Sequence, residues 1–102
     1  MKNDEKFQEL QMLEQNLQNI LMQKQSFQME LSETQSALNE IKNSKDDVFK
    51  IVGQLMIKTE KSKVSDELSG KEKILEIRLK KMQQQEEIFM EKLERLREEV
   101  ID

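Results

Sequence analysis

The side chains that most often carry chemistry in proteins are largely missing from this chain. It has no histidine and no cysteine, so the commonest general base and metal ligand are absent, and disulfides and thiolate metal sites are excluded. It also lacks a glycine-rich phosphate-binding loop of the Walker type. We therefore expect no enzyme activity, no cofactor and no metal site. The informative residues are apolar ones, whose spacing predicts association with other polypeptide segments.

Apolar residues recur at alternating steps of three and four along two long segments. The first stripe comprises Leu10, Leu13, Leu17, Ile20, Lys24, Phe27, Leu31, Thr34, Leu38 and Ile41. The second stripe comprises Leu68, Glu72, Leu75, Leu79, Met82, Glu86, Phe89, Leu93, Leu96 and Val100. This spacing averages about 3.5 residues per repeat, which keeps a narrow seam facing one partner helix. Two such helices joined by a short connection are expected to fold back into an antiparallel coiled coil.

The two stripes also predict which residues face each other. When Leu10 is set opposite Leu96, every facing pair has residue numbers that sum to 106, and the midpoint is Gly53. Lys24 and Glu86 then lie in adjacent layers of the seam and could form an ion pair. Such a pair would fix the register or loosen the seam locally. The alternative is a partly solvated pair that contributes little.

Between the stripes, the pattern changes from helical to β. Residues 48–52 and 55–59 are apolar and rich in β-branched side chains, and the Gly53-Gln54 pair between them is typical of a hairpin turn. A lone hairpin with two unpaired edges is marginal in water. We therefore expect it to join hairpins of other chains, the alternative being an edge ribbon folded against its own coiled coil. The side chains expected on one uncovered apolar face are Phe49, Ile51, Leu55 and Ile57.

Together these patterns predict a mainly α fold, a long antiparallel coiled-coil hairpin with a β-hairpin inserted at the bend. We expect a single domain over residues 1–102, with helices over 4–43 and 61–101 and the β-hairpin over 48–59. Ser62 or Ser65 is expected to cap the second helix.

Composition agrees with long solvated helices. Charged residues make up 37%, aromatic residues 4%, and proline is absent. The N-terminal residues have no apolar run of the kind found in signal peptides, and no segment is apolar enough to predict a membrane span. We therefore expect a soluble cytoplasmic protein with no membrane partner.

The net charge of −4 conceals a regional pattern. Residues 1–47 carry five Lys against nine Asp and Glu, and residues 82–102 carry three Lys and Arg against seven Asp and Glu. The segment 48–81 is basic, with nine Lys and Arg against five Asp and Glu. These charges are either ordinary solvated surface or functional. In the second case, the basic bend helps to bind acidic partner subunits, and the acidic arms repel nucleic acid.

The central stretch resembles a known family. The β-type subunit of prefoldin has a signature of an aromatic residue, a basic residue, two apolar residues, glycine, one variable residue, three apolar residues and a basic residue. The residues that match it in order are Phe49, Lys50, Ile51, Val52, Gly53, Leu55, Met56, Ile57 and Lys58. Gln54 stands where several eukaryotic relatives have proline, and the short arms are more similar to archaeal subunits.

The resemblance implies an ATP-independent chaperone. Prefoldin is a hexamer of two α-type and four β-type subunits, in which hairpins form a double β-barrel platform that carries six coiled coils. The ends of the coils hold unfolded client proteins and pass them to a group II chaperonin. By this resemblance the residues of subunit assembly are Val48, Phe49, Ile51, Val52, Gly53, Leu55, Met56 and Ile57.

Residues near the two termini are the candidates for client binding, because both termini are expected at the free end of the coiled coil. Methionine is flexible and polarizable, which suits a surface that adapts to many partners. Candidates off the stripes are Phe7, Met12, Met90 and Ile101. Candidates on the stripes are Leu10, Leu13, Leu93, Leu96 and Val100, and for the four leucines the favoured alternative is that they close the seam. Met22 and Met29 also fall at outward positions.

Two other functions are considered. A structural coiled-coil scaffold or tether that binds one folded partner would show the same heptad pattern. Nucleic-acid binding through the basic segment is disfavoured, because the lysines there lack interleaved aromatic residues and the arms are acidic.

Overall fold

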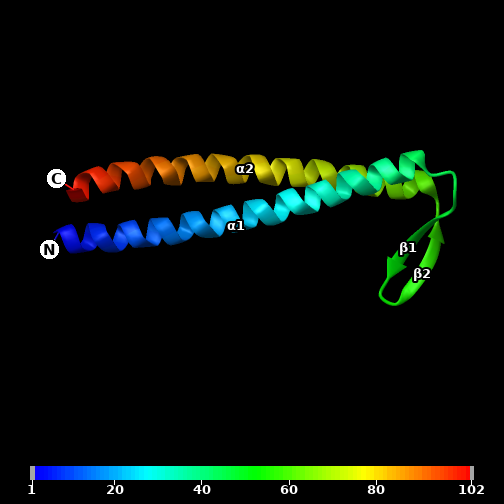
Figure 1. Cartoon of the computed structure of the whole chain (residues 1–102), viewed down its shortest axis with the longest axis horizontal. Coiled ribbons are helices and arrows are strands. Elements are labelled where there is room, and N and C mark those ends of the chain that lie inside the picture. The colour runs from blue at the N-terminus through cyan, green and yellow to red at the C-terminus, as the bar shows by residue number, and fades with distance from the viewer. Residues whose placement is uncertain (1, 102) are drawn as a thin grey trace. The chain divides into compact units, whose positions relative to one another are not determined.

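The computed structural model describes the backbone of residues 2–101 and the side chains of residues 4–100. Helix α1 (Lys2–Asn43) is followed by strands β1 (Val48–Val52) and β2 (Leu55–Thr59), and then by helix α2 (Lys61–Ile101) (Figure 1). Two long helices with a two-stranded antiparallel sheet between them confirm the predicted fold class. The organisation of residues 1–102 as a single domain stays a prediction.

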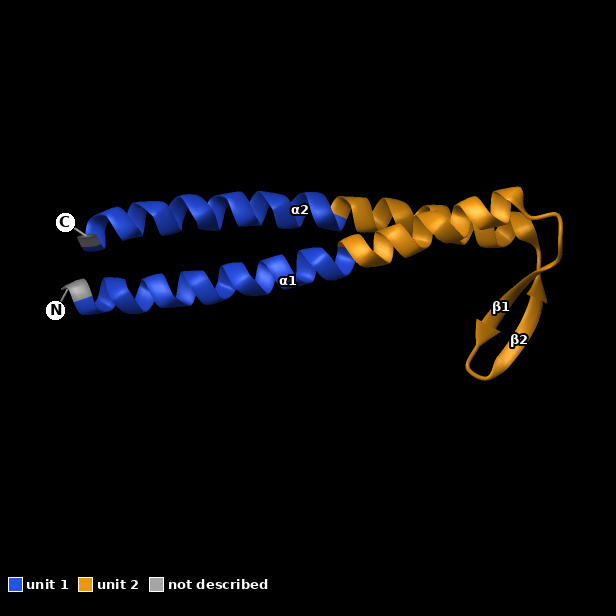
Figure 2. Cartoon of the chain, in the orientation of Figure 1, with its two compact units in different colours: residues 1–27, 78–102 blue, residues 28–77 orange. Residues whose placement is uncertain are grey.

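The chain divides into two compact units (Figure 2), which we call the terminal unit and the hairpin unit. The terminal unit contains residues 1–27 and 78–102, and the hairpin unit contains residues 28–77. In the terminal unit, the two helical segments run antiparallel, so that the start of α1 and the end of α2 lie at the same end of this unit (Figure 1). In the hairpin unit, the remaining segments of α1 and α2 also run antiparallel and are connected through β1 and β2.

Burial along both helices follows the two heptad stripes. All the stripe residues of α1 from Leu10 to Ile41, and of α2 from Leu68 to Val100, are buried or half-buried. The fully buried ones are Ile20, Leu93 and Leu96 in the terminal unit, and Thr34, Leu38 and Leu75 in the hairpin unit. The buried hydroxyl of Thr34 donates a hydrogen bond of 2.8 Å to the carbonyl oxygen of Glu30, one turn earlier, so the seam accepts this polar residue without an unpaired group.

Ion pairs connect the two helices within each unit. They are Lys6–Glu99, Glu14–Arg97 and Lys24–Glu86 in the terminal unit, and Glu30–Lys71 in the hairpin unit. Partners early in α1 meet partners late in α2, as an antiparallel pair requires. The residue numbers of these pairs sum to values between 101 and 111, on both sides of the expected 106.

The turn of the hairpin lies where the sequence predicted it, at Gly53 and Gln54. Val52 pairs with Leu55, so the loop consists of two residues. Gly53 at the first loop position has φ +62°, and Gln54 at the second keeps a negative φ. A glycine with positive φ only at the first position is the geometry of a type II′ turn, whose twist matches that of the paired strands.

The expected composition of the hairpin faces is wrong. Residues directly opposite each other share a face, and the pairs are Val48 with Thr59, Phe49 with Lys58, Lys50 with Ile57, Ile51 with Met56, and Val52 with Leu55. Phe49 and Ile51 therefore share one face, while Leu55 and Ile57 lie on the other. A two-residue loop sets odd-numbered residues opposite even-numbered ones, so the four side chains cannot all lie on one side. Both faces of the hairpin are consequently apolar.

The expected caps of α2 are also wrong. Helix α2 already begins at Lys61, so Ser62 and Ser65 lie inside it. The first backbone hydrogen bond runs from the amide of Val64 to the carbonyl oxygen of Glu60, at 3.2 Å. The Lys61 ammonium donates to the carbonyl oxygen of Ser44 at 2.7 Å, which connects the start of α2 to the segment that follows α1.

Candidate functional site

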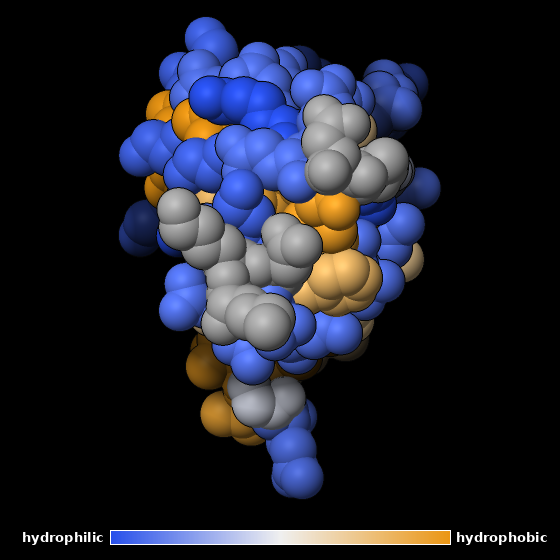
Figure 3. All heavy atoms as spheres, turned by 90° about the vertical axis from the view of Figure 1, so that its left-hand side faces the viewer, coloured by the Kyte–Doolittle hydropathy of each residue, from blue (hydrophilic) through white to orange (hydrophobic). Residues whose placement is uncertain are grey.

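Three of the predicted client-binding residues are exposed large apolar side chains outside the seam of the terminal unit. Phe7 is 53% exposed, Met12 65% and Met90 47%. Phe7 and Met12 lie on α1 next to the stripe positions Leu10 and Leu13, but they point away from α2 because their positions do not follow the three-and-four spacing. Seen from the end of the terminal unit (Figure 3), hydrophobic residues form separate patches among hydrophilic ones. These side chains offer apolar contact without a shaped pocket.

The other predicted client-binding residues are less accessible. Leu93 and Leu96 are buried, at 5% and 7% exposure. Leu10, Leu13 and Val100 are half-buried. All five belong to the seam that holds α1 and α2 together in the terminal unit. The side chain of Ile101 lies outside the described ones.

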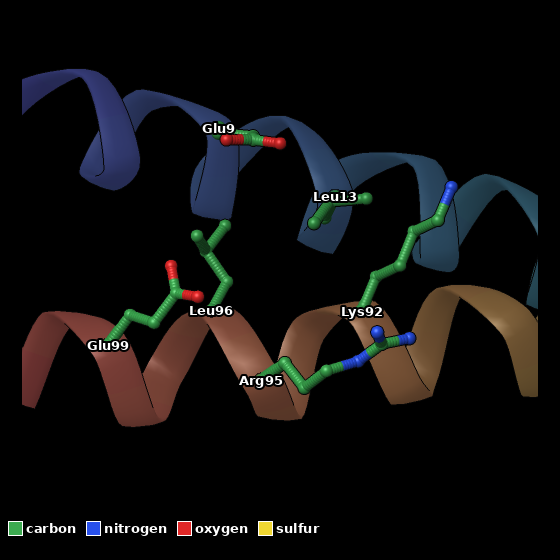
Figure 4. Close-up of a pocket in the computed structure, with 6 residues that line it drawn as sticks. All are labelled: Glu9, Leu13, Lys92, Arg95, Leu96 and Glu99. Atoms are coloured by element: carbon green, nitrogen blue, oxygen red, sulfur yellow. The ribbon is translucent and has the colours of Figure 1, made fainter.

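A hollow of about 340 Å³ lies on one edge of the terminal unit (Figure 4). Its lining residues are Glu9, Leu13, Lys92, Arg95, Leu96 and Glu99. The two leucines come from the seam, and the two carboxylates balance the two cationic side chains. The sequence did not single out this hollow, because it depends on how long, flexible side chains fold over the edge of the helix pair. With balanced charges and shallow apolar walls, it has the character of a gap between surface side chains.

Several exposed apolar residues were missed by the sequence analysis. They are Leu21 and Ile88 in the terminal unit, and Ile74 and Ile77 in the hairpin unit. Met22 and Met29, which the sequence placed outward, are 69% and 67% exposed. The spacing that identified the outward methionines applies equally to the missed residues, which also lie off the two stripes.

The seam of the terminal unit contains an ion pair. The ammonium nitrogen of Lys24 lies 3.0 Å from a carboxylate oxygen of Glu86, and the two side chains are only 21% and 19% exposed. The pairing predicted from the sequence is confirmed. Phe27 lies one turn further along α1. The guanidinium of Arg78, from α2, lies 5.8 Å from the centre of the Phe27 ring and covers this seam residue.

The hairpin exposes apolar side chains on both faces. Those that are about half exposed or more are Phe49, Ile51, Val52, Leu55, Met56 and Ile57. Within the hairpin unit, the Lys50 ammonium lies 3.2 Å from the Glu67 carboxylate of α2, and Lys58 lies 3.4 Å from Asp47. The charged side chains thus make contacts within the unit, while the apolar ones remain in solvent.

Two other features concern the described residues, a metal site and a membrane span. No group of three or more His, Cys, Asp or Glu side chains among them is arranged to hold a metal ion. None of the described helices is long and apolar enough to cross a membrane.

Comparison with known proteins gives one family. The profile of the family described as "Prefoldin subunit" matches residues 4–102. The prefoldin subunit beta of Thermococcus kodakarensis is 43% identical over 90 residues, which cover 86% of this chain and 77% of that protein. The corresponding subunit of Pyrococcus furiosus is 38% identical over 94 residues, covering 90% and 80%.

A solved structure agrees with the sequence relatives. The crystal structure of the prefoldin beta subunit from Thermococcus strain KS-1 superimposes with a TM-score of 0.89 at 37% identity, covering 97% of this chain and 89% of that one. The hairpin signature, the two heptad helices and these matches lead to one conclusion. The chain belongs to the prefoldin family, as a β-type subunit.

Proposed function

We propose that this chain is a subunit of an ATP-independent holdase that captures unfolded proteins and delivers them to a group II chaperonin in the cytoplasm. Prefoldin is a chaperone family, so membership already implies the role of a chaperone subunit. The proposal adds the place of capture, which is the exposed side chains of Phe7, Met12 and Met90 in the terminal unit. It also adds the assembly, a hexamer of two α-type and four β-type subunits joined through their hairpins.

The observation that carries the proposal is the exposure of Phe7, Met12 and Met90. Large apolar side chains that protrude singly, without a pocket, suit clients whose apolar segments have no fixed shape. Two of the three are methionines, whose flexible thioethers adapt to different partners. Each contact is weak, and affinity is expected to arise when several arms of an assembly hold one client at once. The buried leucines of the seam keep the two helices together beneath this surface.

The hairpin supports the assembly part of the proposal. Its strands have unpaired edges and two apolar faces, and such a ribbon is marginally stable alone. Strand pairing with hairpins of other subunits would satisfy the edges and cover the apolar side chains. We assign this role to Val48, Phe49, Ile51, Val52, Gly53, Leu55, Met56 and Ile57.

A scaffold that binds one folded partner is the competing function. Such a partner would require one complementary patch, and a loss of that patch would abolish binding of that protein alone. A holdase instead protects unrelated unfolded proteins. The two functions therefore differ in whether several denatured clients are kept from aggregating without ATP.

The proposal is tested with a triple variant, Phe7→Ser with Met12→Ser and Met90→Ser, assembled with an α-type subunit. Its protection of two unrelated denatured proteins against aggregation is measured by light scattering without ATP. The matched control is Met22→Ser with Met29→Ser and Ile77→Ser, because these three side chains are at least as exposed, at 69%, 67% and 57%.

We expect the triple variant to lose most of its protection and the control to keep it, with both assembling normally. Single substitutions should have little effect, because the contacts act together. Full protection by the triple variant would place the client surface elsewhere. An equal loss in the control would show that exposed apolar area anywhere on the helices is sufficient.

A further inference from the structure

The exposed apolar side chains at the end of α1 have acidic neighbours one helical turn away. Asp4 precedes Phe7 by three residues, and Glu9 precedes Met12 by three. Residues at this spacing lie side by side on a helix surface, with Cβ atoms about 5–6 Å apart. Phe7, Met12 and both carboxylate side chains are exposed. A polypeptide that contacts either apolar side chain therefore also lies beside a carboxylate.

The same arrangement recurs on α2. Glu87 precedes Met90 by three residues and Glu94 follows it by four, and all three side chains are exposed. Glu86, which lies four residues before Met90, is paired with Lys24 in the seam. The positions one turn before and after Phe7, Met12 and Met90 that lie among residues 4–100 contain no Lys or Arg.

Two of the basic side chains nearby form ion pairs within the terminal unit, while Lys92 and Arg95 line the hollow that Glu9 and Glu99 also line. Lys6 pairs with Glu99 at 3.4 Å, and Arg97 pairs with Glu14 at 3.2 Å. Lys92 lies 5.9 Å from the centre of the Phe89 ring. The ion pairs found among the described side chains of this unit involve none of Asp4, Glu9, Glu87 and Glu94. Residues 4–14 and 87–100 together carry nine Asp and Glu against four Lys and Arg, so the charge that reaches an approaching client is mainly negative.

We propose that the exposed side chains of Phe7, Met12 and Met90 select unfolded segments in which apolar residues alternate with lysine or arginine. This inference rests on the proposed client-binding function and names the class of client. An apolar client side chain contacts Phe7, Met12 or Met90, and a neighbouring basic side chain lies beside the adjacent carboxylate. An acidic segment with the same apolar residues makes the same apolar contacts but meets repulsion at each of them.

The effect is expected to be moderate and sensitive to salt. Exposed charge pairs are individually weak, but several act together on one bound segment. We expect a preference of about tenfold for a basic over an acidic segment at about 0.1 M salt. At about 1 M salt the Debye length falls to about 3 Å, and the preference should largely disappear while apolar binding remains.

The test uses the full chain assembled with an α-type subunit and two fluorescent, unstructured peptides. The peptides share their apolar residues and differ only in having lysine or glutamate between them. Binding is measured by fluorescence anisotropy at both salt concentrations. The test variant combines Asp4→Asn, Glu9→Gln, Glu87→Gln and Glu94→Gln.

A control variant changes the same number of charges on the hairpin unit. It combines Glu33→Gln, Glu40→Gln, Asp66→Asn and Glu76→Gln, all of which are exposed. Because the two variants have the same net charge, the comparison separates a local effect from a general attraction of basic peptides to an acidic protein.

The inference predicts that the parent and the control variant prefer the lysine peptide, and that the test variant binds both peptides about equally. Equal binding of both peptides by the parent would overturn it. So would a preference that survives in the test variant or that is lost in the control. If neither peptide binds the parent, the proposed client surface itself fails, and this inference fails with it.

Discussion

Replacement of Lys24 by methionine should destabilise the terminal unit more than an ordinary surface substitution. Methionine has a similar length and fits an apolar seam, but it leaves the Glu86 carboxylate without its partner. That carboxylate is only 19% exposed, so water can replace the lost ammonium only in part. Lys24→Met with Glu86→Met removes both charges from the seam and should restore much of the lost stability.

The magnitude follows from the geometry of the pair. At 3.0 Å and an effective dielectric constant of about 20, the attraction is about 5 kcal/mol. Most of it is offset by the cost of taking both charges out of water. When one partner is removed, the cost of burying the remaining charge is no longer offset by the attraction. We therefore expect a decrease of about 1–3 kcal/mol in the free energy of unfolding. For a domain of this size, each kcal/mol lowers Tm by about 4–8 °C.

The assay is urea unfolding followed by circular dichroism for the parent, both single variants and the double variant. Protein concentration is held constant, because assembly contributes to the apparent stability. These four proteins form a double-mutant cycle. The coupling energy between Lys24 and Glu86 from this cycle distinguishes a pair that stabilises the seam from a solvated pair that contributes little. The reasoning would be refuted if the Lys24→Met variant were as stable as the parent. It would also be refuted if the decrease in the free energy of unfolding of the double variant equalled the sum of the decreases of the two single variants.

Two further predictions concern the hairpin unit. Ile51→Lys places a charge on one apolar hairpin face, so native mass spectrometry with an α-type subunit should show free chains, and circular dichroism should show that these chains retain their helicity. An intact hexamer would contradict the assembly role. Gly70→Ala should raise the free energy of unfolding by about 1 kcal/mol, because Gly70 lies inside α2 and an added Cβ meets nothing within 4 Å; an unchanged urea midpoint would show that this part of α2 does not limit stability.

The helix pairing could be predicted from the sequence because a heptad repeat determines both the structure and the buried face. The stripe positions are buried or half-buried even where the residue is polar, as at Thr34 and Lys24. The exposed apolar residues follow from the same rule, since Phe7, Met12 and Met90 lie off the stripes. The buried state of Leu93 and Leu96 also follows from their stripe positions.

The error in the hairpin faces did not come from missing sequence information, because the predicted Gly53-Gln54 loop already implies the register. Both strands are apolar along most of their length, so alternation does not show which side chains share a face. The register depends on the number of loop residues, and the pairing of Val52 with Leu55 fixes it. The expected caps of α2 are wrong, although its expected start at residue 61 agrees with the structure, because serine is only a weak indication of a cap and both serines lie after Lys61.

The central claim is that unfolded clients are held at the end of the terminal unit, and three methionines of α1 test it most directly. Met12, Met22 and Met29 are almost equally exposed, at 65%, 69% and 67%. A benzophenone amino acid is placed at each position in turn, and crosslinking to a denatured client is measured in the assembled protein without ATP. The account predicts strong crosslinking at Met12 and little at Met29. Equal crosslinking at all three positions would contradict it, because exposure alone would then determine where clients bind.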